Sequence, residues 1–310
     1  MREVLGRLRV QSAPPRRMNR LSDKERARIL SCLVEGNSMR ATQRITGAAK
    51  RTVESVLREA GGRCSKLMAE KMVNLPCEQI QCDEIWSFVG CKARTLIRTL
   101  RSETATGAAA RKTAAKFGWG DSWCLVAIDP VTKLIPTWEV GDRGAVTAYH
   151  FMRDLQPRLA HRVQLTTDGH LPYLVAVKAA FLSTSIDYGM LVKIYGEASE
   201  SGKYSPGQVV GAKRERIMGQ PETASICTSH VERQNLTVRM SNRRFTRLTN
   251  GFSKSLTSHK HSLALHFAHY NFCRIHSSLR VTPAMEAKLT DHIWELEELL
   301  TWQPKAEAAT

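Results

Sequence analysis

Residues 79–89, QIQCDEIWSFV, decide the fold and hold its most unusual residue. The Ile, Trp, Phe and Val side chains of this stretch favour a strand, whereas Asp83 at its centre is a poor strand former. Asp83 inside a strand therefore suggests a role other than strand formation. Four further segments show the same strand signal, with helical periodicity between them. The predicted strands are 79–89, 123–128, 134–140, 163–168 and 190–195, and the predicted helices that follow them are 146–159, 173–181, 229–240, 263–270 and 284–301.

The order of these elements predicts the architecture. Three strands come first, followed by helix, strand, helix, strand, a polar glycine-containing loop at 196–227 and further helices. This order is typical of an α/β fold in which a mixed five-stranded sheet is flanked by helices. A basic, Ala-rich insert at 91–120 separates the first two strands. We interpret the insert either as a flexible loop that touches DNA or as a disordered segment.

The first 78 residues predict a small helical module. Residues 1–17 form a basic tail, and 18–62 contain three short helices, the first opened by a capping box at Ser22-x-x-Glu25. The third helix ends at Gly61-Gly62, and a linker covers 63–78. Three helices of this kind indicate a helix-turn-helix DNA-binding domain, although a packing module with a solvated charged face has the same pattern. The face predicted to enter the major groove carries Lys50, Arg51, Thr52, Ser55 and Arg58.

Composition narrows the class of protein. The chain has 310 residues, of which 42% are hydrophobic, and 46 Lys and Arg against 29 Asp and Glu give a net charge of +17. A packed core and a polyanionic partner, most often nucleic acid, follow from these values. The chain contains no apolar run of about 20 residues, as a membrane span requires. Its eight cysteines form no Cys-x-x-Cys pair, so we expect a reducing, cytoplasmic setting.

Three acids far apart in the sequence are the candidate catalytic residues. Asp83 lies in the first strand, Asp168 ends the fourth, and Glu232 opens an Arg-containing helix. Ligand sites in such sheets gather beyond strand ends. Three neighbouring carboxylates repel one another unless cations neutralise them, and carboxylate oxygens suit Mg²⁺ or Mn²⁺. Two such ions can hold the attacking and leaving oxygens of a phosphoryl transfer.

Each acid also has a structural interpretation. Glu84 adjoins Asp83, but side chains alternate across a strand, so only one of the two is expected to face the site. Asp168-Gly169 is also a common turn sequence, and Ser229-x-x-Glu232 is also a capping box. Against that, Glu232, Asn235 and Arg239 share one helix face. The remaining rivals for the third carboxylate are Asp187, Glu197, Glu215 and Glu222.

The chain resembles bacterial insertion-sequence transposases of the DDE type, closest to the family founded by insertion sequence one. The matching motifs are CDEIWSFVG at 82–90, TDG at 167–169, SHVERQN at 229–235 continuing to RRFTRLTN at 243–250, YNFCRIH at 270–276 and TPAM at 282–285. The resemblance implies an RNase H-like catalytic domain over 79–283 with Asp83, Asp168 and Glu232 as its metal-binding triad. It also implies Mg²⁺-dependent cleavage that frees a 3′-hydroxyl, attack of that hydroxyl on target DNA, and a phosphate-positioning role for Arg239.

The remaining expectations concern partners. Asn235, Arg243, Arg244 and Arg247 are predicted to contact double-stranded DNA, on which the protein is expected to act as a homo-oligomer. Histidines between 259 and 276 have metal-like spacing but form no complete zinc set. The acidic helix within 284–310 either packs on the core or makes a subunit contact. The alternative functions are an inactive DNA-binding protein, a nuclease of the same fold without strand transfer, and a regulator acting through residues 18–62 alone.

Overall fold

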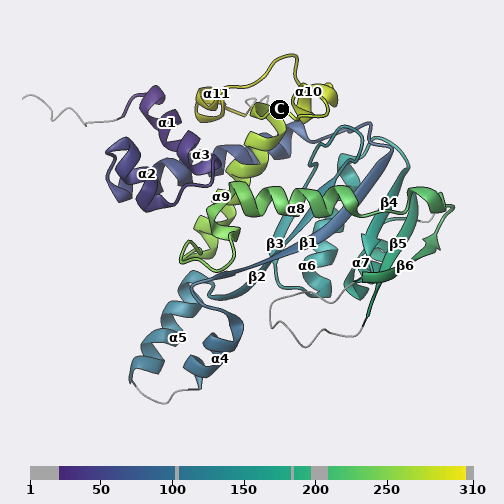
Figure 1. The fold of residues 1–310 in the computed structure, drawn as a ribbon, viewed down its shortest axis with the longest axis horizontal. Helices are drawn as coiled ribbons and strands as arrows, with labels where there is room; N and C mark the ends of the chain where they lie inside the picture. Colours follow the sequence, from purple (N-terminus) through teal and green to yellow (C-terminus); the bar gives the residue numbers. More distant parts are fainter. Residues whose placement is uncertain (1–20, 102–104, 183–184, 197–208, 305–310) are drawn as a thin grey trace, which may run out of the picture.

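The computed structural model describes residues 21–101, 105–182, 185–196 and 209–304 (Figure 1). The basic tail predicted at 1–17 lies outside these residues. The chain is an α/β protein built on one mixed sheet, as the element order predicts, in the strand order β3-β2-β1-β4-β5-β6. β1, β4 and β5 run parallel, whereas β2 and β6 pair antiparallel to their neighbours. The strands are β1 Gln79–Val89, β2 Gly120–Ile128, β3 Trp138–Gly141, β4 Val163–Asp168, β5 Ile186–Tyr195 and β6 Val209–Met218.

Within the described residues the sheet has six strands, so the prediction of five is wrong. The additional strand, β6, lies in the segment 196–227 that the sequence predicts to be mostly loop. β6 is an edge strand whose side chains are largely exposed and mostly charged between Lys213 and Arg216. An edge strand of this kind lacks the apolar run by which buried strands are recognised. It extends the sheet beyond β5, whose residues Leu191, Val192, Lys193 and Tyr195 line the cleft described below.

Helices cover both faces of the sheet. α8 and α9 lie over one face: Asn235 of α8 contacts Asp83 of β1, and His259 of α9 contacts Ser87. α6 and α7 pack against each other on the opposite face, where Tyr173 is fully buried (Figure 1). A short π-helical turn, His269–Cys273, continues α9. These helices are α6 Ala145–Leu155, α7 Leu171–Ala180, α8 Ser229–Ser241 and α9 Leu256–Ala268.

The amino-terminal helices pack against the rest of the molecule, mainly through the contact of α3 with α9. They are α1 Asp23–Val34, α2 Met39–Thr46 and α3 Lys50–Lys71. The capping box of Ser22 and Glu25 is confirmed. The predicted helix end at Gly61-Gly62 and the linker from residue 63 are wrong, because α3 runs unbroken to Lys71. α3 crosses α9 so closely at Gly61 that a Cβ there would lie 2.6 Å from the Cβ of His261.

The insert between β1 and β2 is a helical hairpin. Its helices are α4 Ala93–Leu100 and α5 Ala105–Phe117, so the predicted loop at 91–120 is largely helical. The hairpin projects from the end of β1 and β2, away from the other helices (Figure 1). Asp121 accepts a hydrogen bond from the backbone N–H of Ala93 at 2.9 Å, which stabilises the start of α4.

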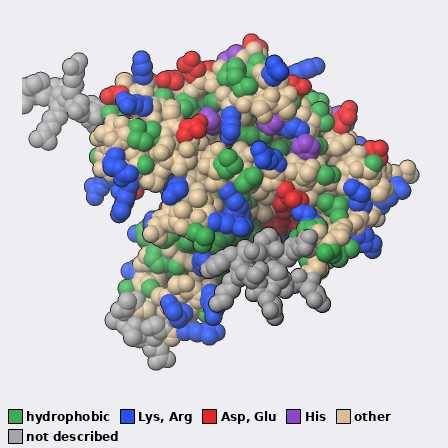
Figure 2. Space-filling view, in the orientation of Figure 1, with side chains coloured by type: hydrophobic (Ala, Val, Ile, Leu, Met, Phe, Trp, Pro, Cys, Tyr) green, Lys and Arg blue, Asp and Glu red, His purple; other side chains and the backbone are tan. Residues whose placement is uncertain are grey.

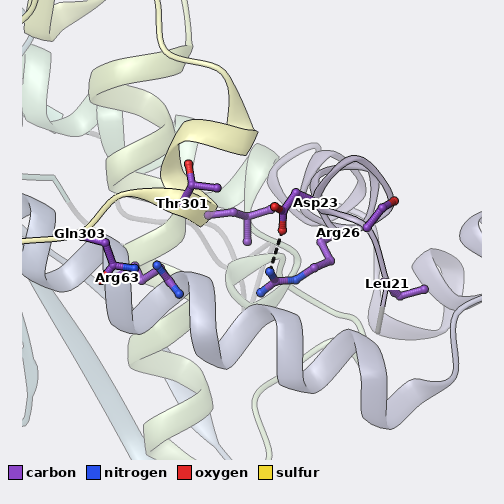
Figure 3. A pocket seen from close by; sticks show the side chains of 8 residues that line it. Leu21, Asp23, Arg26, Arg63, Thr301 and Gln303 are labelled. Carbon is purple, nitrogen blue, oxygen red and sulfur yellow. Dashed lines mark hydrogen bonds and ion pairs between the residues drawn. The ribbon is translucent and has the colours of Figure 1, made fainter. Parts of the chain in front are cut away.

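The carboxyl-terminal segment packs on the amino-terminal helices. The single helix predicted at 284–301 is wrong: α10 Pro283–Glu286 ends before Lys288, whose φ of 58° is left-handed, and α11 Leu296–Thr301 follows. Leu299 and Leu300 are buried, and α11 contacts α1 and α3. A cavity of about 410 Å³ remains between these helices, where Arg26 is paired with Asp23 at 3.0 Å (Figure 3).

Candidate metal centre

Parallel pairing of β1 with β4 brings two of the predicted acids together. The ladder ends with Cys82 opposite Thr167, so the next residues on each strand are Asp83 and Asp168. Carboxylate oxygens of Asp83, Glu84 and Asp168 lie within 4.8 Å of one another. Asp168 also accepts a hydrogen bond from the backbone N–H of His170 at 3.0 Å, which fixes its direction. Three oxygen donors at this spacing can bind a metal ion.

Glu84 belongs to this cluster, although only Asp83 of the two lines the cleft, as the alternation of side chains predicts. Side chains do alternate along β1, but the β1–β4 ladder has ended before this point. With no neighbouring strand on that side, carboxylates from both faces of β1 reach the same space. Glu84 accepts hydrogen bonds from the guanidinium of Arg143, at 2.7 Å from Nε and 2.5 Å from Nη2. No pattern in the sequence predicts the place of Glu84 in the cluster or its pairing with Arg143.

Glu232 borders the same cleft, which has a volume of about 690 Å³, together with Asp83 and Asp168. Its carboxylate is outside the 4.8 Å cluster and pairs with Lys193 Nζ at 2.6 Å. The alternative capping box with Ser229 is absent from the structure, because Thr228 precedes the helix and Ser229 is its first residue. Figure 2 shows acidic side chains in a hollow on this face, with Lys and Arg side chains on the surface around it.

The helix face that carries Glu232 also supports Asp83. The Nδ2 group of Asn235 donates to Asp83 at 2.9 Å, and Asn235 is buried. Its predicted DNA contact is therefore replaced by a contact to a carboxylate of the cluster. Arg239 follows on the same face, and burial lowers the pKa of its guanidinium to about 10, with the charge of Arg247 adding to the decrease and that of Asp83 opposing it. Arg239 therefore contributes a positive charge close to the acids.

The acids of the cluster repel one another in a buried setting. Burial raises the pKa of Asp83 to about 7, and the charges of Glu84, Asp168 and Glu232 add to the increase. Burial and the charge of Asp168 also raise the pKa of Glu84, although Arg143 opposes them. A divalent cation would remove this electrostatic cost, so the donor set and its charge fit a hard metal ion.

The raised pKa of Asp83 predicts an unusual pH dependence of stability in the metal-free protein. The folded state holds a proton on Asp83 up to about pH 7, whereas the unfolded chain releases it near its ordinary value of about 3.9. The contribution of this group to stability therefore falls as pH rises from 4 to 7. Asp83→Asn is expected to stabilise the protein by about 4 kcal/mol at pH 8 and by little at pH 4.

Urea unfolding in EDTA at both pH values checks this expectation. Glu215→Gln is the matched control, because Glu215 is paired with Lys213 on the edge strand and lies outside the cluster. Equal stability of Asp83→Asn and the unmodified protein at pH 8 would contradict the argument.

The rival acids lie in other environments. Asp187 pairs with Arg162 at 2.5 Å, Glu215 with Lys213 at 2.7 Å, and Glu222 accepts a hydrogen bond from Ser225 at 2.6 Å. Glu197 lies outside the described residues. Among the histidines between 259 and 276, His259 is fully buried and has a structural role. Its Nε2 atom is 3.2 Å from the Ser87 hydroxyl oxygen, and its Nδ1 atom is 2.7 Å from the Ser253 hydroxyl oxygen.

The predicted DNA-contacting residues differ in exposure and in the contacts that they make within the chain. On α3, Lys50, Arg51, Ser55 and Arg58 are exposed and Thr52 is partly exposed. Arg247 is exposed and Arg243 partly so. Arg244 instead donates to Ser253 at 3.0 Å and Ser258 at 3.1 Å, and burial lowers its pKa to about 10. Arg244 is partly exposed, as Arg243 is, but these hydrogen bonds hold its guanidinium against two serines of the same chain.

The fold and the site together define an α/β protein with a carboxylate cluster at the end of a central parallel strand pair. No protein-family model matches the chain, and no curated protein shows significant sequence similarity to it. Among the described residues, no helix combines the length and apolar character needed to cross a bilayer.

Proposed function

We propose that the chain is a DDE-type transposase with an RNase H-like core, which cuts DNA at transposon ends and joins the freed 3′-hydroxyl to target DNA. The observation that carries this proposal is the common cleft of Asp83, Asp168 and Glu232, which come from β1, β4 and α8. The strand arrangement supports it, since β2 alone is antiparallel among the first five strands. The motif resemblance described above points to the same reaction.

The residues of the cleft suit a pair of Mg²⁺ or Mn²⁺ ions. Asp83 and Asp168 would hold them, with Glu232 as the third ligand once it leaves Lys193, and Glu84 is close enough to take part. Bound ions of this kind lower the pKa of water and offset charge on a phosphate. Asn235 holds Asp83 in place, and Arg239 and Lys193 supply positive charge beside the cleft for a phosphodiester.

DNA binding is the second part of the proposal. The exposed face of α3 would enter a major groove as the recognition helix of a helix-turn-helix, and the net charge of +17 favours the DNA backbone. Cleavage at two transposon ends requires two active sites, so we propose a homo-oligomer assembled on double-stranded DNA. Action on the bacterial chromosome places the protein in the cytoplasm.

Arg247 and Arg244 are expected to respond differently to substitution, although both were predicted to contact DNA. Arg247→Ala removes an exposed charge, so it should weaken binding to duplex DNA evenly across sequences and reduce the salt slope by about 1. Arg244→Ala leaves Ser253 and Ser258 without their donor and should destabilise the fold by about 2 kcal/mol. Anisotropy titrations at several salt concentrations and thermal unfolding separate the two effects. Equal loss of DNA affinity in both folded variants would contradict the division.

A strand-transfer assay tests the proposed function. The full chain is incubated with Mg²⁺, a labelled duplex carrying the inverted repeats that flank its gene, and a plasmid target. Joined product with a free 3′-hydroxyl intermediate is expected. Cleavage without joining would favour a nuclease of the same fold, and binding without cleavage would favour an inactive DNA-binding protein. A regulator working through residues 18–62 alone is disfavoured by the packing of α3 on α9.

A further inference from the structure

Four aromatic side chains form a row on one face of the sheet. Three of them come from β1 and β2, and the fourth, Phe252, comes from the segment before α9. Trp86 stands directly opposite Trp123 in the antiparallel ladder, so both rings are on the same face of the sheet. Phe88 follows on that face, with its ring centroid 5.7 Å from that of Trp86, and Phe252 continues the row 4.7 Å beyond Phe88. All four side chains are partly exposed within the described part of the chain. We call these four residues the aromatic row.

Cations lie over three of the four rings. Lys92 Nζ is 5.6 Å from the ring centroid of Trp86, and Arg143 Cζ is 4.8 Å from that of Trp123. Lys254 Nζ is 3.1 Å from the ring centroid of Phe252. Each cation is attracted by the ring beneath it, yet the Lys92, Arg143 and Lys254 side chains are all exposed. The surface thus alternates flat apolar rings with positive charge.

Arg143 connects the aromatic row to the carboxylate cluster. The same guanidinium that lies over Trp123 donates to Glu84. Glu84 and Trp86 are two positions apart on β1, so they share a face of the strand. A DNA strand with one phosphate at the carboxylates would therefore carry its neighbouring nucleotides onto the aromatic row.

We propose that the aromatic row is a stacking platform for unpaired bases of the DNA strand that enters the carboxylate cleft. The identity of the ligand as DNA rests on the proposed function. Aromatic rings accept the faces of any base, and interspersed cations hold the phosphates between them, which is the chemistry of single-strand binding sites. Bases inside a duplex have their faces covered by stacking, so the row selects a strand that is locally unpaired. An apolar protein segment would satisfy the rings but would offer no negative charge to the exposed Lys92 and Lys254 side chains.

Binding of a short fluorescent oligothymidylate to the full chain in EDTA tests this platform, because the probe forms no duplex for the amino-terminal helices to bind. Trp86→Leu and Phe252→Leu should each weaken the measured affinity about tenfold, as expected for the loss of one stacked base. Trp86→Phe keeps an aromatic face and should restore most of the affinity. Trp302→Leu is the matched control, because Trp302 lies at the end of α11 beside Arg63 and should leave binding unchanged.

Thermal unfolding shows whether each variant is folded, and Trp86→Phe provides a second, conservative variant should Trp86→Leu fail to fold. The platform is overturned if the wild-type chain does not bind oligothymidylate, or if folded Trp86→Leu and Phe252→Leu bind it like wild type. In that case Mg²⁺-dependent strand transfer by the wild-type chain would still support the transposase. Conversely, loss of oligothymidylate binding in the two variants supports the platform even if the wild-type chain neither cuts nor joins DNA.

Discussion

Asp83→Asn is expected to reduce Mg²⁺-dependent cleavage of transposon-end DNA by about a thousandfold or more, a loss of about 4 kcal/mol of transition-state stabilisation. Asp83 is the central acid of the cluster, since its pKa is raised first by burial and then by the charges of Glu84, Asp168 and Glu232. Asparagine keeps the shape and the contact with Asn235 but removes the charge that would hold a cation. Asp168→Asn should have a similar effect, because Asp168 belongs to the same group of oxygens.

Glu232→Gln distinguishes the proposed triad from the cluster seen in the structure. Glu232 is the acid paired with Lys193, whereas Glu84 is the acid held within 4.8 Å of Asp83 and Asp168. Glu232→Gln is expected to lose activity to an extent comparable to that of Asp83→Asn. Asp187→Asn is the control, because that residue is paired with Arg162 away from the cleft. Full activity of Asp83→Asn, measured as nicked product per enzyme, would refute the catalytic assignment.

Gly61→Ala is expected to destabilise the fold by about 3 kcal/mol. A Cβ at this position would stand 2.6 Å from the Cβ and the carbonyl oxygen of His261 and 2.7 Å from its Cα. These atoms belong to the backbone of α9 or to its first side-chain carbon, so they yield only if the two helices separate, and overpacking of this kind costs about 1–3 kcal/mol or more. The packing of α3 against α9, which connects the amino-terminal helices to the rest of the protein, depends on the close approach of Gly61 to His261.

The neighbouring residue provides the control for that substitution. A Cβ added at Gly62 meets no atom within 4 Å. Gly62→Ala should therefore stabilise the protein by about 0.5–1 kcal/mol, since alanine favours a helix interior over glycine. Chemical unfolding of both variants measures the difference. The same effect in both, of either sign, would contradict the close crossing of α3 and α9.

The central strand and the meeting of two acids could be predicted from the sequence. Residues 79–89 have an unambiguous strand pattern, and the predicted bounds agree with β1. Asp168 ends a second buried strand, and adjacent parallel strands place such residues side by side. These features depend on local pattern and on the general geometry of sheets, which the sequence carries directly.

Other features depend on contacts between distant segments, and the sequence does not specify them. Glycine is a poor helix former, so Gly61-Gly62 indicates a helix end, whereas Gly61 is required by the approach of His261 from 200 positions away (261 − 61). Similarly, the sequence predicts that the Asn235 amide contacts DNA, whereas in the structure this amide donates a hydrogen bond to Asp83. The sequence does not indicate β6, because its run of four charged residues, Lys213–Arg216, resembles a polar loop.

The central claim is that Asp83 and Asp168 bind divalent metal ions in one cleft with Glu232. Anomalous diffraction from crystals soaked in Mn²⁺ tests it most directly. Manganese peaks bound by carboxylate oxygens of Asp83 and Asp168 are expected, with the Glu232 carboxylate released from Lys193 and facing the ions. A protein that takes up no manganese between Asp83 and Asp168, with both acids placed as in the metal-free structure, would contradict it.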